Sequence, residues 1–178
     1  PELLRDLDYQ FFRRMIGTRW GQAFQLFIGG TGTITPFHNA MSPFFFTTVS
    51  GTKRWSLVPN HYLAVMNPPA DRFQYNHSDV ALDFSNVDEF PGLDSIDHLE
   101  AIVDAGDLLF VPSWMWHGVD NLNPTIGIRC GFMYVPGALR ESITLAMLRM
   151  LIGDPNMIRW LYYSYVNTNL PDRKHLLL

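Results

Sequence analysis

Short apolar runs separated by turn residues fill the middle of the chain, and no other feature restricts the fold as much. The turns are marked by clusters of glycine, proline, asparagine and aspartate, for example at residues 29–32, 104–107 and 121–124. Many short strands with frequent turns predict a β-sandwich or a β-barrel. The expected strands cover residues 24–28, 44–50, 54–58, 101–103, 108–111 and 126–134.

Apolar residues at helical spacing flank this region on both sides. Those within residues 1–23 predict a short amphipathic helix, and residues 139–152 and 156–169 predict a helical pair. The pair is apolar on more than one face, so it either packs on the barrel or forms a homodimer interface. Three segments are therefore expected: an N-terminal helical segment (1–23), a β-domain (24–137) and a C-terminal helical segment (138–178) that dimerises through its helices.

Length and composition set broad limits on the class of protein. The chain has 178 residues, which suits one domain, and its 14% aromatic and 17% charged residues exclude a disordered chain. The net charge of −4 lacks the basic field of a nucleic-acid binder, so a nucleic-acid partner is not expected. No apolar stretch is long enough for a transmembrane helix, so no membrane partner is expected.

The single cysteine and the N-terminus bear on the compartment. Cys130 has no second cysteine to pair with, which indicates a reducing, cytoplasmic or otherwise intracellular location. The N-terminus does not resemble a signal peptide, and because it lacks an initiator Met we expect trimming or an upstream segment.

Residues 60–98 are polar and irregular, and we interpret them as a long insertion between strands. Long loops in compact domains are usually functional or mobile. Arg72, Tyr75 and His77 lie in this insertion and are candidates for the lining of a substrate groove.

Two of the six histidines stand apart from the rest. His38 and His117 each close a unit made of an apolar strand and a turn. The sequence around His38 is GTITPFHNA at residues 32–40, and the sequence that ends at His117 is GDLLFVPSWMWH at residues 106–117. A third block, GTKRW at residues 51–55, lies between them.

These three blocks, in this order and at compatible spacings, resemble the JmjC and cupin-like family of Fe(II)/2-oxoglutarate oxygenases, in particular its compact protein hydroxylases. The family pattern reads roughly G-x-x-T-P-x-H-x-D/E, then G-x-K-R-W, then G-D-L-L-F-V-P-x-x-W-x-H. The resemblance runs from about residue 26 to residue 137. It implies a mainly β fold, the double-stranded β-helix or jelly roll.

The resemblance also implies roles for individual residues. His38 and His117 resemble the two imidazole ligands of Fe(II), a metal that binds 2-oxoglutarate and the co-substrate O₂ at its open positions. Lys53 and Thr35 resemble the residues that hold the far carboxylate of 2-oxoglutarate. A lysine beside Thr35 would be an unpaired buried charge unless an anion met it, although a lysine extending from a hairpin to solvent is the structural alternative.

The sequence departs from the family pattern at three positions. The carboxylate ligand of the family stands two residues after the first histidine, where this chain has Ala40, whose methyl group cannot bind metal. Two positions where the hydroxylases often carry asparagine are Phe44 and Gly131. The surroundings of the metal are therefore expected to be drier than in a typical hydroxylase.

Ala40 leaves four interpretations open. It replaces a natural aspartate through engineering, or it marks a halogenase-like site in which chloride takes the vacant position. A site that binds metal weakly or binds a different metal is the third interpretation, and a non-catalytic cupin-like binding or dimerisation domain is the fourth. The function we expect first is hydroxylation of a protein or peptide side chain, and a small-molecule substrate is also open.

Other residues are weaker candidates for the site. Arg129 is a second candidate for the 2-oxoglutarate carboxylate if its side chain faces inward. Asp120, three residues after His117, is the nearby carboxylate that could replace the missing ligand. Trp116 is a candidate for the substrate region, although packing at the barrel mouth is the more ordinary role for Trp114 and Trp116.

Overall fold

The computed structural model describes residues 10–11, 14, 23–67 and 76–151, and all structural statements refer to these residues. Most of the expected N-terminal helix and all of the expected helix at residues 156–169 lie outside them. Arg72 and Tyr75, two of the candidates for the substrate groove, also lie outside them.

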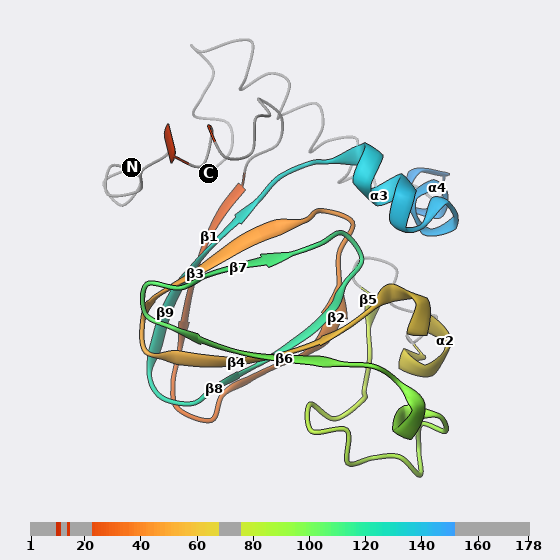
Figure 1. Cartoon of the computed structure of the whole chain (residues 1–178), viewed down its shortest axis with the longest axis horizontal. Helices are drawn as coiled ribbons and strands as arrows, with labels where there is room; N and C mark the ends of the chain where they lie inside the picture. Colours follow the sequence, from red (N-terminus) through yellow and green to blue (C-terminus); the bar gives the residue numbers. More distant parts are fainter. Residues whose placement is uncertain (1–9, 12–13, 15–22, 68–75, 152–178) are drawn as a thin grey trace.

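Two antiparallel sheets face each other and form a jelly roll (Figure 1). One sheet has the order β1-β9-β3-β7, and the other has the order β5-β2-β8-β4-β6. The predicted mainly β, cupin-like fold is therefore confirmed. In chain order the strands are β1 (Ala23–Gly29), β2 (Ile34–Asn39), β3 (Phe44–Ser50), β4 (Thr52–Val58), β5 (Asn76–His77), β6 (Leu99–Asp104), β7 (Leu108–Val111), β8 (Trp116–Asn121) and β9 (Thr125–Gly131).

The predicted bounds of the strands agree best with the observed bounds where apolar residues are densest. β3 and β7 have the predicted bounds, whereas β9 ends at Gly131, three residues before the predicted end. Neither β2 nor β8 was among the expected strands, although they carry the two candidate histidines. Pro36, Gly118 and Asp120 weaken the local strand signal of these segments. The register of β2 against β8 shifts between Thr35 and His38, and such an irregularity is where a strand tolerates proline.

Alternation of side chains places a core between the two sheets. In β3 the side chains of Phe44, Phe46 and Thr48 are buried, while those between them are half-buried. Phe44 and Phe46 pack against Trp55 of β4 and Val119 of β8, which come from the opposite sheet. These side chains therefore define the inner face of the barrel.

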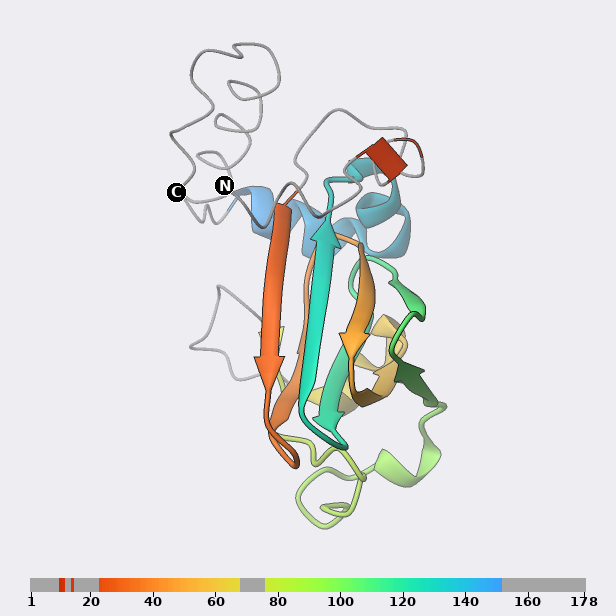
Figure 2. The same cartoon turned by 90° about the vertical axis from the view of Figure 1, so that its left-hand side faces the viewer.

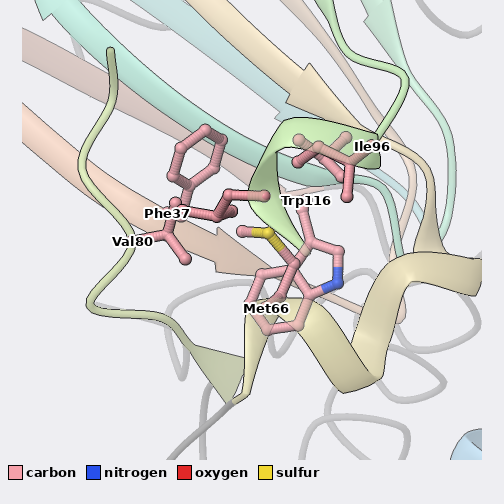
Figure 3. Close-up of a cluster of buried hydrophobic side chains, with 7 residues drawn as sticks. Phe37, Met66, Val80, Ile96 and Trp116 are labelled. Carbon is pink, nitrogen blue, oxygen red and sulfur yellow. The ribbon is translucent and has the colours of Figure 1, made fainter. Parts of the chain in front are cut away.

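The segment between β4 and β6 covers the outer face of the second sheet. It contains two 3₁₀ turns (Asn60–Tyr62 and Leu93–Ser95), the short helix α2 (Leu63–Met66) and β5. Phe37 and Trp116 point from the sheet into this layer and pack with Met66, Val80 and Ile96 (Figure 3). β8 is consequently buried on both faces.

Two helices follow the last strand and lie at one end of the sheet β1-β9-β3-β7 (Figure 2). They are α3 (Val135–Glu141) and α4 (Ile143–Leu151), so the prediction of a single helix over residues 139–152 is wrong. Ser142 separates them in an extended conformation, and its hydroxyl accepts a hydrogen bond from the backbone N–H of Leu145 at 3.2 Å. That capping bond begins α4 and explains the break.

One face of the helical pair packs on the barrel. Ala138 and Ala146 are buried against Met41 and Trp114, and the indole N–H of Trp114 donates to the carbonyl oxygen of Ala138 at 3.1 Å. Homodimerisation through this region stays a prediction. No helix in the described ranges is long and apolar enough to cross a membrane.

Candidate functional site

His38 and His117 come together on the inner face of the barrel. They stand directly opposite each other in the antiparallel pair of β2 and β8. The centroids of the two imidazole rings are 4.1 Å apart. Strand pairing therefore joins the two histidines that the sequence motifs single out.

Hydrogen bonds set the tautomer of each histidine. The Nδ1 atom of His38 lies 3.0 Å from the carbonyl oxygen of Pro36, and that of His117 lies 2.9 Å from the carbonyl oxygen of Met115. A carbonyl oxygen only accepts, so each Nδ1 carries the proton and donates it. The lone pair of each ring is then on Nε2. Histidines that bind metals commonly make this kind of bond, which orients the ring and leaves Nε2 for the metal.

Burial keeps both imidazoles neutral. It lowers the pKa of His117 from 6.5 to about 3, with smaller contributions from the neighbouring His38 and from the positive charge of Arg129. The pKa of His38 is also lowered, chiefly by burial and further by His77 and Arg129. Both rings are therefore neutral near pH 7, which is the form that binds a metal.

A third protein ligand does not join this pair in the described residues. Ala40 follows β2, and its carbonyl oxygen accepts a hydrogen bond from the backbone N–H of Trp114 at 2.7 Å. Asp120 forms an ion pair with Arg54 at 2.8 Å. Being three positions from His117 on β8, Asp120 lies on the opposite face of the sheet. No group of three His, Cys, Asp or Glu side chains within the described ranges is arranged to hold a metal ion.

A third histidine lies beside the pair. His77, on the short edge strand β5, stands opposite His38 in the register of the sheet. The ring centroids of His38 and His77 are 5.8 Å apart and the planes are inclined by 27°, so the rings stack. The insertion therefore reaches the edge of the candidate site through His77, and a role for His77 in a substrate groove stays a prediction.

Lys53 lies inside the barrel on β4. It is 4% exposed, its Nζ donates to Oδ1 of Asn121 at 2.5 Å, and it lies 5.6 Å from the centroid of the Phe46 ring. No carboxylate in the described part of the chain forms an ion pair with it. Burial lowers the pKa of the Lys53 ammonium group. Thr35 stands opposite Val119, which places it on the same inner face.

Sequence reasoning missed Asn121, a buried amide that hydrogen-bonds to Lys53, Thr33 and Thr125. Besides accepting from Lys53, its Oδ1 accepts from the hydroxyl of Thr125 at 2.9 Å. Its Nδ2 donates to the carbonyl oxygen and to the hydroxyl oxygen of Thr33, at 3.0 and 2.8 Å. A signal was available, because Asn121 stands four positions after His117 on a strand and so faces the same side.

The side chain of Arg129 faces inward. Arg129 stands opposite both Phe46 and Gln25 in the sheet, and its Nη1 donates to Oε1 of Gln25 at 2.8 Å. Its Cζ lies 4.5 Å from the centroid of the Phe44 ring, and that ring lies 5.1 Å from the ring of His117. The guanidinium group therefore belongs to the layer that holds the two histidines.

The structure does not bring Trp116 into the site. It follows the alternation of β8 to the face opposite His117 and is fully buried in the core beneath the insertion. Trp114 is also buried, in the contact with Ala138. Both tryptophans therefore have packing roles, and the candidate site consists of His38, His117, Lys53, Thr35, Asn121 and Arg129.

Comparison with known proteins agrees with the cupin-like fold. A family model described as a cupin-like domain matches residues 1–134. The chain is 27% identical over 107 residues to the lysine-specific demethylase JMJ30 of Arabidopsis thaliana, which covers 60% of this chain. It is 34% identical over 110 residues to the arginine-specific demethylase JMJ20 of the same plant, covering 58% of this chain. It is 32% identical over 140 residues to HSPB1-associated protein 1 of Bos taurus, covering 75% of this chain.

The matched region is a small part of each relative. It spans 25% of the first demethylase, 22% of the second and 28% of the bovine protein. The similarity therefore identifies the domain. Most of the length of each relative lies outside the matched region.

Proposed function

The chain belongs to the cupin-like family that contains the JmjC demethylases, and from this premise we propose that it is the catalytic domain of an Fe(II)- and 2-oxoglutarate-dependent oxygenase. The observation that carries the proposal is the pair His38 and His117, whose Nδ1 protons are both held by backbone carbonyls at 3.0 and 2.9 Å. The reaction we propose is hydroxylation of a protein or peptide side chain.

The two histidines fit a metal ion of this class. Both rings are neutral, both leave Nε2 for coordination, and they face each other across one strand pair. Imidazole is a suitable ligand for Fe(II). His38 and His117 would hold the ion, and the remaining positions would be open to the keto acid, O₂ and a further ligand.

Lys53 fits the far carboxylate of 2-oxoglutarate. Its buried ammonium group has a neutral amide, that of Asn121, as its hydrogen-bond partner. A buried charge is costly unless an opposite charge meets it, so an anion bound here is stabilised by more than its hydrogen bonds. Thr35 would offer its hydroxyl from the same face.

A buried hydrogen-bond donor without a partner in the same layer supports the proposal that a polar ligand binds there. The indole N–H of Trp55 is buried and has no hydrogen-bond partner among the described residues. The ring of Trp55 stacks at 6.0 Å from that of His117. Buried donors are rarely left without an acceptor, and a bound oxygen-rich molecule would supply one.

When bound, Fe(II) and 2-oxoglutarate activate O₂ for attack on a C–H bond of the substrate. The residues of this chain would bind these two groups and orient them. His38 and His117 would hold the ion, while Lys53 and Thr35 would orient the keto acid. The apolar rings of Phe44, Phe46 and Trp55 exclude water from the space between them.

An anaerobic titration with Fe(II) and 2-oxoglutarate tests the proposal. We expect a visible metal-to-ligand charge-transfer band that requires both components, and a stronger band in Ala40→Asp, which restores a carboxylate. His117→Ala should lose the band, whereas Arg54→Gln, on the outer face, should keep it. Absence of the band from both the unaltered chain and Ala40→Asp, with both folded by circular dichroism, would show a non-catalytic jelly-roll domain.

A further inference from the structure

The turn between β7 and β8 contains a backbone conformation that is rare for a large side chain. Trp114 has φ +63°, in the left-handed region that favours glycine. It occupies the third position of a four-residue turn, which the backbone N–H of Met115 closes on the carbonyl oxygen of Pro112 at 3.4 Å. A strained residue of this kind persists only where its surroundings hold it, and such residues cluster at functional sites.

Two hydrogen bonds hold Trp114 in this conformation. Its backbone N–H donates to the carbonyl oxygen of Ala40 at 2.7 Å, and its indole N–H donates to the carbonyl oxygen of Ala138 at 3.1 Å. Trp114 is 1% exposed and packs with Met41, Ala138 and Ala146. Its backbone is therefore joined to the residue that follows β2, and its side chain is joined to α3.

The same turn carries the hydrogen-bond acceptor for His117. The carbonyl oxygen of Met115, the residue after Trp114, lies 2.9 Å from Nδ1 of His117. This bond keeps the proton on Nδ1 and leaves the lone pair on Nε2. The position of the Met115 carbonyl group, and with it the orientation of the His117 ring, therefore depends on the backbone conformation of Trp114.

The bond to Ala40 connects the turn to the strand of the other histidine. Ala40 stands two residues after His38 and directly follows β2. His38 and His117 stand opposite each other in the pair of β2 and β8, with ring centroids 4.1 Å apart. The bond from Trp114 to Ala40 lies at the end of this strand pair, so it ties β2 to the turn that leads into β8.

We propose that Trp114 is a positioning residue through which the helical pair α3 and α4 holds His117 in the orientation that a metal ion requires. The contact with α3 keeps Trp114 in its strained conformation, and the strained turn presents the Met115 carbonyl oxygen to Nδ1 of His117. If α3 leaves the barrel, the turn relaxes and His117 loses its acceptor. The role in metal binding rests on the proposed function, whereas the effect on the His117 ring needs no metal.

Trp116 provides a matched control for Trp114. It stands two residues further on and is also fully buried, but it packs in the separate cluster beneath the insertion. Its indole N–H has no hydrogen-bond partner among the described residues. Phenylalanine at either position therefore removes one buried indole N–H, but only at Trp114 does the change break a bond to the helical pair.

NMR of the metal-free protein with ¹⁵N-labelled histidine tests the link directly. The chemical shifts of the two ring nitrogens report which of them carries the proton in a neutral histidine. At pH 7.5 we expect a single Nδ1-protonated form of His117 in the unaltered chain and in Trp116→Phe. In Trp114→Phe we expect a mixture of the two tautomers, because Ala138 no longer holds the turn.

Ala138→Leu makes the same test from the helical side. Ala138 is fully buried, so the larger side chain overfills the cluster around Trp114 and moves α3 away from an unaltered indole. This variant should give the same mixture of His117 tautomers as Trp114→Phe. It also decides the question if Trp114→Phe does not fold.

Titration with Co(II), followed by its d–d absorption, measures the consequence for the metal site. Trp114→Phe and Ala138→Leu should each weaken Co(II) binding at least tenfold. Because both changes break one link, the double variant should bind Co(II) no more weakly than the weaker single variant. Trp116→Phe should bind Co(II) within twofold of the unaltered chain.

The outcomes separate the link from the metal site. If Trp114→Phe and Ala138→Leu, both folded by circular dichroism, keep a single Nδ1-protonated form of His117, the link is wrong. If Trp116→Phe gives the same mixture as Trp114→Phe, the effect is one of packing and the link is also wrong. If the tautomers change as expected but Co(II) binds neither the unaltered chain nor Ala40→Asp, the positioning of His117 stands and the proposed metal site is wrong.

Discussion

Lys53 and Asn121, 68 residues apart in the sequence, are joined inside the barrel by a hydrogen bond of 2.5 Å from Nζ to Oδ1. Asn121 also accepts from Thr125 and donates twice to Thr33, so its amide links β4, β8, the turn before β2 and the start of β9. A side chain that satisfies so many groups at once is expected to dominate the stability of this end of the barrel.

Replacement of this amide should be costly. We expect Asn121→Ala to lower the free energy of unfolding by about 3 kcal/mol, since buried partners are left unsatisfied. Urea denaturation measures the change. Asn123→Ala is the matched control, because Asn123 is exposed and its side chain bonds only to Thr52 among the described residues. This variant should cost about 1 kcal/mol. Equal losses in the two variants would contradict the role given to Asn121.

Removal of the buried ammonium group should separate folding from ligand binding. We expect Lys53→Met to keep or raise the melting temperature of the ligand-free protein, because a buried charge is replaced by an apolar chain of similar length. With metal and 2-oxoglutarate present, the unaltered chain should gain stability by mass action and Lys53→Met should gain much less. Differential scanning fluorimetry measures both. Arg54→Met, whose side chain faces the outer surface with Asp120, should retain the full ligand-induced shift.

The buried histidine predicts an acid-sensitive fold. His117 has a pKa of about 3 when folded and about 6.5 when unfolded, so between these values the unfolded chain binds a proton that the folded chain does not. Stability contributed by neutral His117 is present above pH 6.5 and is lost as pH falls toward 3. The expected slope is about 1.4 kcal/mol per pH unit for this group.

Chemical denaturation at several pH values from 7 to 4 measures this slope. His117→Asn should reduce this slope by about 1.4 kcal/mol per pH unit, which corresponds to one proton bound on unfolding. An unchanged slope in the variant, with unchanged dependence on denaturant, would contradict the assignment of the acid sensitivity to His117.

Two glycines with positive φ should respond differently to alanine. Gly51 has φ +82° in the connection from β3 to β4, and a Cβ there would collide with the carbonyl oxygen of Pro124. Gly32 has φ +71° and nothing within 4 Å of an added Cβ. We expect Gly32→Ala to cost about 1 kcal/mol, from backbone strain alone, and Gly51→Ala to cost about 3 kcal/mol. Similar costs at both positions, measured by thermal or urea unfolding, would show that the turn relaxes around the added methyl group.

Cys130 should be inert in the folded protein. Its side chain is fully buried, and burial raises the pKa of the thiol to about 11. We expect reaction with a disulfide reagent at pH 8 to be slow and to accelerate strongly in denaturant. Rapid labelling of the native protein, with circular dichroism unchanged, would contradict this burial.

Local patterns were sufficient for much of the fold and for the choice of candidate site residues. The strands over residues 44–50 and 108–111 were predictable because apolar and β-branched residues are dense there. His38, His117, Lys53 and Thr35 could be singled out because each stands in a short motif whose residues are contiguous. The departure from the family pattern at Ala40 could be recognised for the same reason.

Other features depend on contacts between distant segments. The helix break at Ser142 was missed because the apolar period continues across it, and only the capping bond to Leu145 interrupts the helix. The strand β8 was missed because Gly118, Asp120 and Asn121 have low strand propensity. Its stability comes from pairing with a strand on each side and from burial on both faces.

The sequence by itself determined the strand-rich character of this protein and singled out His38, His117 and Ala40 as the positions to examine, because these are properties of contiguous residues. The tertiary structure alone decided which face of each strand is inside. It placed His38 opposite His117, Lys53 against Asn121 and Arg129 over Phe44. Alternation along a strand determines which residues share a face, but the choice of the inner face and of the register comes from packing between strands far apart in the chain.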